Sequence, residues 1–390
     1  MRPSSRIALS LLALSTAASG AILAQRAMPS PTSSAQAAGA TSQIVAAANS
    51  LLATLDDAGR RKVQFPFEGP QKARWSNLPT GIFQREGLRL GDLNTAQRAA
   101  AMKLLAAALS ANGYRKVTEI MQGDEVLRSQ PQQGRGNRGG RGGNGAPPAA
   151  ARPGGAGPSG PPPQDGARGR GRGGAGGGGG VAFGEDEYYM AFVGTPSTTT
   201  PWMLQFGGHH LAINLTMAGS QATLAPSLPG AQPARFTIEG REIRPLGKES
   251  DTAFALINAL SESARGQAIL KSRVADLVLG PGQDGRAIQP EGLRASAMSP
   301  VQQTMLLDIV QEWAGIMADG FAGPRMAEVK STLADTYFAW SGDLTPGSPS
   351  YFRIQGPTLV IEFAPQGTPD HIHGIYRDPT NDYGAKIAKP

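Results

Sequence analysis

Cysteine is absent from this chain of 390 residues, and histidine occurs only four times. Without a thiol the chain can form neither disulfide bonds nor iron–sulfur clusters, and cysteine-ligated zinc and blue-copper sites are excluded as well. A folded core must therefore be stabilised by burial of apolar side chains, and the globular part is long enough to build a sizeable core.

Long apolar runs are also missing, because no stretch after the first 24 residues is long enough to span a bilayer as a helix. Residues 1–24 contain Arg2, Arg6, a short apolar run at 7–14 and small residues before a cleavage point at Ala24. This pattern predicts a secretory signal peptide, with an uncleaved anchor as the alternative. We expect a periplasmic or extracellular protein whose mature chain has no transmembrane span.

The net charge of +7 is concentrated in one stretch of unusual composition. Residues 129–180 are dominated by Gly, Pro, Arg and Ala and hold seven arginines against a single acid, Asp165. Such a segment cannot bury enough apolar surface to offset its ordering entropy, which predicts a disordered insert within one domain. Its Arg-Gly repeats lack interleaved aromatic residues, so we expect a solvated spacer and do not expect nucleic acid as a partner.

The remaining chain divides into helices and strands by its hydrophobic periodicity. After a flexible lead-in at 25–40, residues 41–128 predict a helical first part of the globular domain, and 181–384 predict an α+β remainder of the same domain. Helices and strands occur in blocks rather than in alternation, and we expect no internal repeat. The predicted class is α+β, with mostly antiparallel sheet packed against helices. The expected helices are 42–57, 95–111, 114–127, 251–264, 300–317 and 324–335, and the main expected strands are 188–193, 202–206, 209–217, 336–340, 350–354 and 358–363.

The four histidines form two close pairs, His209-His210 and His371-x-His373. Side chains alternate faces along a strand, so His371 and His373 should point the same way, whereas only one of His209 and His210 should reach a given site. Two imidazoles from one strand and one from another supply the three ligands of a catalytic metal site. The sequence therefore predicts a divalent transition metal, zinc, copper or iron, at His210, His371 and His373, with His209 as the further candidate.

Three other side chains are candidates for chemistry beside such a metal. Glu362 or Asp378 would serve as the general base, and Arg377 offers a bidentate fork for an anionic group of a substrate. Two alternatives stay open: a metal-free polar pocket built from the same groups, or buried histidines with a structural role. For Arg377, an internal Arg–Asp pair that pins the C-terminal loop is an equal alternative.

These patterns favour an exported metal-dependent hydrolase acting on a small molecule or polymer that the sequence does not identify. The alternative is a non-catalytic periplasmic ligand-binding or scaffold protein whose histidines are structural. A third hypothesis gives the Arg-Gly insert a role in contacting an anionic polymer or a membrane surface.

Four motifs in order also resemble a known family. They are Arg74-Trp75-Ser76-Asn77-Leu78-Pro79, the helix end Ser110-Ala-Asn-Gly-Tyr114, Gly208-His209-His210-Leu211 with the proline-rich stretch after it, and His371-Ile-His373 followed by Arg377-Asp-Pro-Thr-Asn-Asp-Tyr383-Gly384. With these motifs the chain is similar to the domain-of-unknown-function 3500 family from residue 44 to 383, interrupted by the insert. This resemblance implies no catalytic residues, since the family has no assigned function.

Overall fold

The computed structural model describes residues 31–130 and 180–388, so the predicted signal peptide and nearly all of the predicted insert lie outside the described residues. The helices are α1 (Pro31–Ala53), α2 (Asp57–Val63), α3 (Thr95–Ala108), α4 (Ala111–Ser129), α5 (Gly247–Ala259), α6 (Glu262–Ala268), α7 (Pro300–Ala314) and α8 (Asp319–Ser331). Short 3-10 helices are η1 (Pro70–Ala73), η2 (Leu90–Asp92), η3 (Glu185–Glu187), η4 (Ala295–Ala297), η5 (Leu333–Asp335) and η6 (Asp382–Gly384). Within the described part of the chain, no helix has the length and apolar character needed to cross a membrane.

The strands form two principal sheets and one short hairpin. The first sheet holds β1 (Gln64–Phe65), β2 (Leu88–Arg89), β3 (Tyr189–Val193), β4 (Trp202–Gly208), β5 (Leu211–Ala218), β6 (Gln221–Thr223) and β7 (Leu228–Pro229). The second holds β10 (Leu293–Arg294), β11 (Tyr337–Ser341), β12 (Tyr351–Gly356), β13 (Leu359–Pro365) and β14 (Ile372–Arg377), and β8 (Phe236–Ile238) pairs with β9 (Arg241–Ile243). Pairing is antiparallel except between β1 and β3, which confirms the predicted α+β class.

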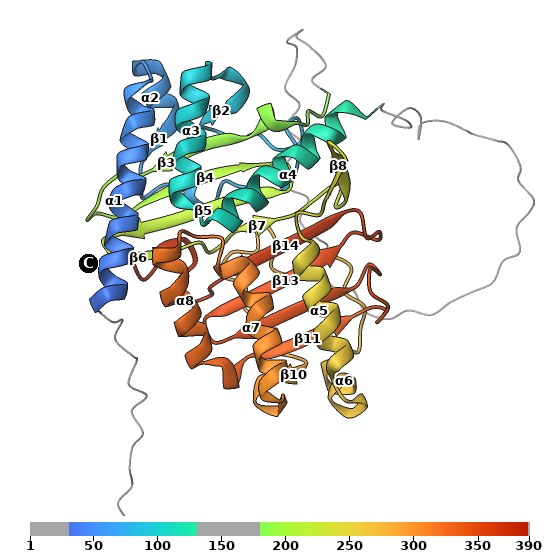
Figure 1. The fold of residues 1–390 in the computed structure, drawn as a ribbon. Helices are drawn as coiled ribbons and strands as arrows, with labels where there is room; N and C mark the ends of the chain where they lie inside the picture. The colour runs from blue at the N-terminus through green and yellow to red at the C-terminus, as the bar shows by residue number, and fades with distance from the viewer. Residues whose placement is uncertain (1–30, 131–179, 389–390) are drawn as a thin grey trace, which may run out of the picture.

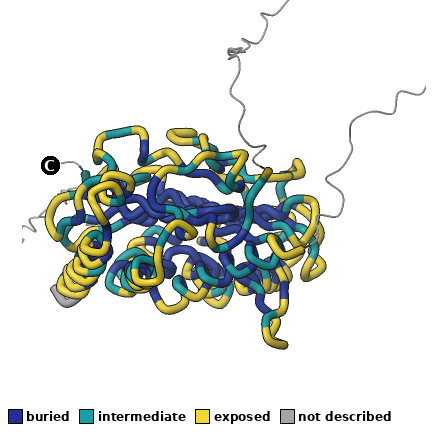
Figure 2. The backbone as a smooth tube through the Cα atoms, turned by 90° about the horizontal axis from the view of Figure 1, so that it is seen from above, coloured by how far each residue is buried: buried dark blue, intermediate teal, exposed yellow. Residues whose placement is uncertain are grey.

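The segment 227–231 joins the two principal sheets edge to edge. On one side it pairs with β5, where Leu211 faces Pro229, and on the other it bridges to β14, where Ala231 faces Ile372. The helices cover one face of the combined sheet, and irregular loops cover the other (Figures 1 and 2). Residues that alternate along β14 therefore point either to a helix face or to a loop face.

The chain consists of two halves with the same architecture, the first from α1 to β7 and the second from α5 to β14. The expectation that there is no internal repeat was therefore wrong. The sequence Glu-Gly-Leu-Arg occurs at 86–89 and again at 291–294, and each copy leads through a short strand and a 3-10 turn into a helix. Both helices begin with a capping box, Asn94 with Gln97 in α3 and Ser299 with Gln302 in α7. Reciprocal capping of this kind satisfies two backbone donors at each start.

The sheet hairpins repeat with the same register. β4 and β5 are joined by a two-residue turn between Gly208 and Leu211, and β12 and β13 by a two-residue turn between Gly356 and Leu359. One ion pair also occurs at matching positions in both halves. Arg89 pairs with Glu187 in the first half, and Arg294 pairs with Asp335 in the second. In the second half α8 is followed directly by η5. At the matching place in the first half, residues 131–179, which the structure does not describe, lie between α4 and η3 in the sequence.

An approximate twofold axis relates the halves. The amide of Ser110 donates to the carbonyl of Ile316 over 3.0 Å, and the amide of Ala318 donates to the carbonyl of Ala108 over 3.0 Å. Leu109 and Met317, which precede the matching N-caps of α4 and α8, form the antiparallel bridge between these bonds. A contact in which each residue meets its own counterpart is characteristic of a twofold interface.

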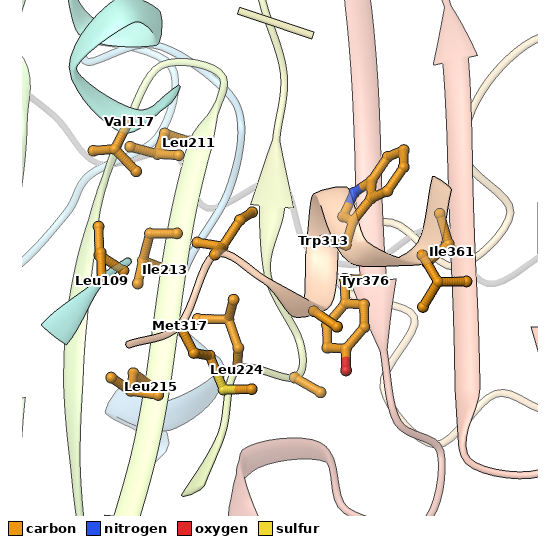
Figure 3. Close-up of a cluster of buried hydrophobic side chains, with 14 of the residues drawn as sticks. Leu109, Val117, Leu211, Ile213, Leu215, Leu224, Trp313, Met317, Ile361 and Tyr376 are labelled. Atoms are coloured by element: carbon orange, nitrogen blue, oxygen red, sulfur yellow. The ribbon is translucent and has the colours of Figure 1, made fainter. Parts of the chain in front are cut away.

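The core is continuous across this axis. Figure 3 shows Leu211, Ile213 and Leu215 of β5 on the same side of the sheet as Trp313 of α7 and Tyr376 of β14, and all five are almost completely buried. Burying one large apolar side chain stabilises a fold by roughly 1.5–3 kcal/mol. The two halves therefore share one core rather than touching through polar surfaces.

Several predicted boundaries need correction. The predicted flexible lead-in at 25–40 is helical from Pro31 onward. The helix α1 begins well before residue 42, where the periodic apolar residues predicted its start. Asn112 and Gly113 lie inside α4 rather than ending α3, since Ser110 caps a new helix only two residues after α3 ends. Pro324 lies within α8 rather than opening it. The predicted helix at 251–264 is split into α5 and α6 by the cap Ser261.

The repeated glycine of the Glu-Gly-Leu-Arg sequence is expected to tolerate no side chain. Gly292 has φ +99°, and a Cβ there would lie 2.2 Å from the carbonyl oxygen of Phe338. We expect Gly292→Ala to lower the free energy of unfolding by roughly 2–5 kcal/mol, through strain and displacement of β11. Gly266→Ala in α6 is the control, because nothing lies within 4 Å of its Cβ position and helix propensity predicts a gain of about 0.5–1 kcal/mol. Urea denaturation midpoints measure both, and equal midpoints would contradict the prediction.

Candidate metal centre

The first histidine pair forms the two-residue turn between β4 and β5, rather than the start of a strand as predicted. His210 adopts φ +58°, a left-handed conformation that residues other than glycine seldom adopt. Its amide donates to the carbonyl of Asn77 over 3.1 Å, and its carbonyl accepts from the amide of Gly230 over 2.7 Å. The loop before β2 and the segment between the sheets therefore hold the backbone of His210 from two sides.

His209 turns toward α4, away from the other histidine pair. Its Nδ1 lies 2.6 Å from a carboxylate oxygen of Asp124, and the ring of Phe183 packs edge-on against it at 4.9 Å. The hydroxyl of Tyr188 donates to the His209 carbonyl over 2.9 Å. Of the two neighbours, His210 is thus the one that reaches the second pair.

The ring nitrogens of His210, His371 and His373 form one close group. The Nε2 atoms of His210 and His371 are 2.8 Å apart, and those of His371 and His373 are 3.1 Å apart. In a tetrahedral site with zinc–nitrogen bonds of about 2.0–2.1 Å, ligand nitrogens lie roughly 3.3 Å from one another. Two of the three nitrogen pairs are therefore close to the spacing of a metal site, and all three nitrogens lie within 4.8 Å of one another. No other group of three or more candidate ligands occurs in residues 31–130 and 180–388.

The electrostatic environment keeps two of these imidazoles neutral. Burial, together with the neighbouring histidines, lowers the pKa of His210 well below its ordinary value. Burial and the proximity of His373 lower the pKa of His371 to about 4. At neutral pH both rings keep an unprotonated nitrogen, as a metal ligand must. His371 is only half-buried, so the group is reached from solvent on its side.

Asp276 orients one of the three rings from outside the group. One carboxylate oxygen lies 3.1 Å from Nδ1 of His373 and also accepts from the side-chain amide of Gln366 over 2.8 Å. Partial burial acts to raise the pKa of Asp276, but its hydrogen bonds, with His373 foremost, hold that pKa below the usual range. A carboxylate only accepts hydrogen bonds, so the proton of His373 is on Nδ1 and the Nε2 lone pair faces the group. Carboxylate–histidine pairs of this kind are typical of metal ligands.

Comparison with known sequences agrees with the motifs noted above. The profile of the family described as "Protein of unknown function (DUF3500)" matches residues 37–385. The chain belongs to the DUF3500 family. No curated protein and no solved structure shows a significant match. The match spans both halves of the DUF3500 protein, including all four histidines.

Glu362, predicted as a general base, lies fully buried in β13 of the DUF3500 protein. Its carboxylate accepts from the backbone amides of Val278 and Leu279 over 3.0 and 2.8 Å, and from the hydroxyl of Tyr351 over 2.6 Å. These bonds hold the loop that carries Asp276 against the sheet. The described contacts of Glu362 are thus with this loop and with Tyr351, and its role as a base stays a prediction.

Arg377 and Asp378 are engaged in buried contacts within the DUF3500 fold, outside the group of three histidines. The guanidinium of Arg377 lies 2.9 Å from Asp284 and 2.8 Å from Asp382, which is the internal Arg–Asp pair considered as an alternative. Asp378 pairs with Arg325 at 3.2 Å. Both side chains fasten the C-terminal turn, and no described contact links them to the histidines.

Sequence reasoning missed two residues of this site, Asn77 and Asp276. Asn77 belongs to a loop of the first half, and its side-chain Nδ2 lies 3.1 Å from Nε2 of His373. Asp276 belongs to a loop of the second half, far from either histidine pair in the sequence. A polar residue in a loop carries no local signal of a site, and only the meeting of the two loops on the sheet identifies them.

Proposed function

We propose that this DUF3500 protein is a metal-dependent hydrolase with a single transition-metal ion at His210, His371 and His373. The observation that carries the proposal is the convergence of three Nε2 atoms while Asp276 holds the opposite nitrogen of His373. Zinc is favoured over copper and iron for hydrolysis, because it has no redox chemistry and acts as a Lewis acid that lowers the pKa of water it binds. Three protein ligands leave a position open for that water or for substrate.

The residues of this chain would each supply a distinct part of the function. His210 comes from the first half, and His371 and His373 come from the second, so a bound ion would connect the halves. Asp276 would raise the basicity of His373 and fix its orientation. We carry the predicted export into this proposal, with a periplasmic or extracellular substrate whose identity the geometry leaves open.

A second candidate is a non-catalytic ligand-binding or scaffold protein, in which the histidine group is structural. It is favoured by the burial of His210 and by the fact that the group draws on both halves of the chain. In that case an ion, or hydrogen bonds among the rings, would stabilise the fold without turnover. Zinc-dependent hydrolysis of chromogenic ester, amide and phosphate-ester substrates separates the two candidates, since a scaffold has none.

Adding zinc to chelator-treated protein is expected to raise its melting temperature. A ligand that binds only the folded state at 100 times its dissociation constant adds about 2.7 kcal/mol of stability. Magnesium is the control, because it prefers oxygen ligands and should give no shift. Thermal unfolding followed by circular dichroism measures the effect. Equal responses to zinc and magnesium would argue against a nitrogen-ligated site.

A further inference from the structure

Asn77 contacts the group of three histidines through its side chain. In the part of the chain that the structure describes, no other non-histidine side chain is seen to hydrogen-bond to the Nε2 atom of His210, His371 or His373. Nδ2 of Asn77 lies 3.1 Å from Nε2 of His373, the same atom that lies 3.1 Å from His371. The side chain is half-buried and comes from the loop of the first half, opposite the loop that carries Asp276. The carboxamide therefore lies at hydrogen-bond distance from one of the three nitrogens that would hold the ion.

The chemistry of this contact changes when the lone pair of His373 is taken by an ion. Since Asp276 holds the proton on Nδ1, Nε2 accepts a hydrogen bond from the Asn77 amide. An ion bound at Nε2 would take this acceptor, and an N–H donor of Asn77 would then be available beside the ion. A hydrogen-bond donor fixed beside a metal stabilises a negatively charged oxygen there, as donors in oxyanion sites do.

The loop is built to hold Asn77 in this position. The carbonyl of Asn77 accepts from the amide of His210, so its backbone is bonded to one of the ligands. One guanidinium nitrogen of Arg85 donates to the carbonyls of Ser76 and Leu78, on either side of Asn77, over 2.7 and 2.6 Å. The same nitrogen donates to the carbonyl of Gly208 over 2.7 Å, at the start of the histidine turn. The side chain of Asn77 is thereby positioned before any ligand arrives.

We propose that Asn77 is a positioning residue that donates a hydrogen bond to an oxygen ligand in the open position of the ion. The inference rests on the proposed metal centre and defines its substrate class further. The reacting group of the substrate would present a carboxylate, ester or amide oxygen that accepts this hydrogen bond. Binding of the ion to the three histidines would not require Asn77.

The test uses the full-length protein loaded with Co²⁺, whose absorption spectrum reports its ligands, and acetate as the oxygen-ligand probe. Asn77→Ala is expected to bind Co²⁺ within threefold of the wild type but to bind acetate about tenfold more weakly, because a hydrogen bond to a charged group is lost. Asn77→Asp should abolish acetate binding and tighten Co²⁺ binding, since its carboxylate would occupy the open position. Ile82→Ala, an exposed change on the same loop, is the control and should match the wild type.

The outcomes separate this inference from the proposal on which it rests. A wild type that takes up no Co²⁺ would overturn the metal centre and the role of Asn77 together. A wild type that binds both Co²⁺ and acetate, with unchanged acetate affinity in Asn77→Ala, would overturn only the role of Asn77. Parallel loss of Co²⁺ and acetate binding in Asn77→Ala would also overturn it, because that result indicates support of the ligands rather than contact with the probe.

Discussion

A His371→Ala, His373→Ala double variant is expected to lose all of the metal that the wild type retains. Each change removes an Nε2 atom from the group, and His210 alone cannot hold an ion against solvent. Both positions lie at or near the start of β14, and His371 is half-buried, so we expect the variant to fold. Elemental analysis of untagged protein purified without chelator gives the stoichiometry directly.

His209→Gln is the matched control for this experiment. It removes an imidazole next to His210 that is bonded to Asp124 and lies outside the group of three. We expect this variant to keep the stoichiometry of the wild type. Metal retained in full by the double variant would place ligation elsewhere in the chain. Metal absent from the wild type would favour the metal-free alternatives, and ligand screening by thermal shift would follow.

Lys116→Met is expected to cost 3–5 kcal/mol of stability, the usual effect of removing one partner from a buried ion pair. Lys116 of α4 is 1% exposed, and its ammonium contacts the carboxylates of Glu249 in α5 and Glu312 in α7. The first half thus inserts a cation between two acids of the second half. Glu312 keeps a second partner, Lys248 at 2.6 Å, so Glu249 is the carboxylate left uncompensated.

The double variant Lys116→Met, Glu249→Leu should recover most of this loss. Replacing a buried ion pair by apolar side chains of similar volume is often neutral, whereas leaving one charge behind is not. Chemical denaturation of the two single variants and the double variant forms a cycle that measures the coupling. A double variant no more stable than Lys116→Met would show that packing, rather than the unpaired charge, causes the loss.

The cost of Lys116→Met should also depend on pH. Burial raises the pKa of Glu249 above its ordinary value, even though Lys116 acts to lower it, and removing Lys116 raises it further. A carboxyl group with a raised pKa binds its proton more tightly in the folded state, so stability is greatest at low pH and falls as pH rises. The unfolded state is the same for both proteins, so the gap between variant and wild type should widen once the pH rises above the raised pKa of Glu249 in the folded wild type. Urea midpoints measured from acidic to neutral pH test the trend.

Local signals in the sequence were reliable wherever one element determined its own structure. The predicted helices at 95–111 and 300–317 begin at the capping residues Asn94 and Ser299, residue types that favour a helix start. The alternation that turns His371 and His373, at the start of β14, to the same side was also predictable. The internal repeat had a signal too, the Glu-Gly-Leu-Arg sequence at 86–89 and 291–294, but four residues are easily overlooked beside the different sequences that follow them.

The site required more than local signals. His209 and His210 form a two-residue turn instead of the predicted start of a strand. The direction of the His210 side chain is therefore set by its left-handed backbone and not by the alternation of a strand. In the sequence, Arg377 and Asp378 are candidates for substrate binding and catalysis. In the structure they pair with Asp284 and Arg325, which come from distant segments that the sequence does not connect to them. Whether a charged side chain meets a ligand or an internal partner depends on what packs against it, which periodicity does not encode.

The sequence by itself determined the α+β class, the absence of thiol chemistry, the family and the restriction of imidazoles to two clusters. Tertiary structure alone decided that the clusters meet, because His210 and His371 belong to different halves joined by the segment 227–231. It also brought Asn77 and Asp276 to opposite sides of His373. Hydrophobic patterning fixes which face of each element is buried, whereas the approximate twofold packing of two such units decides which polar loops become neighbours.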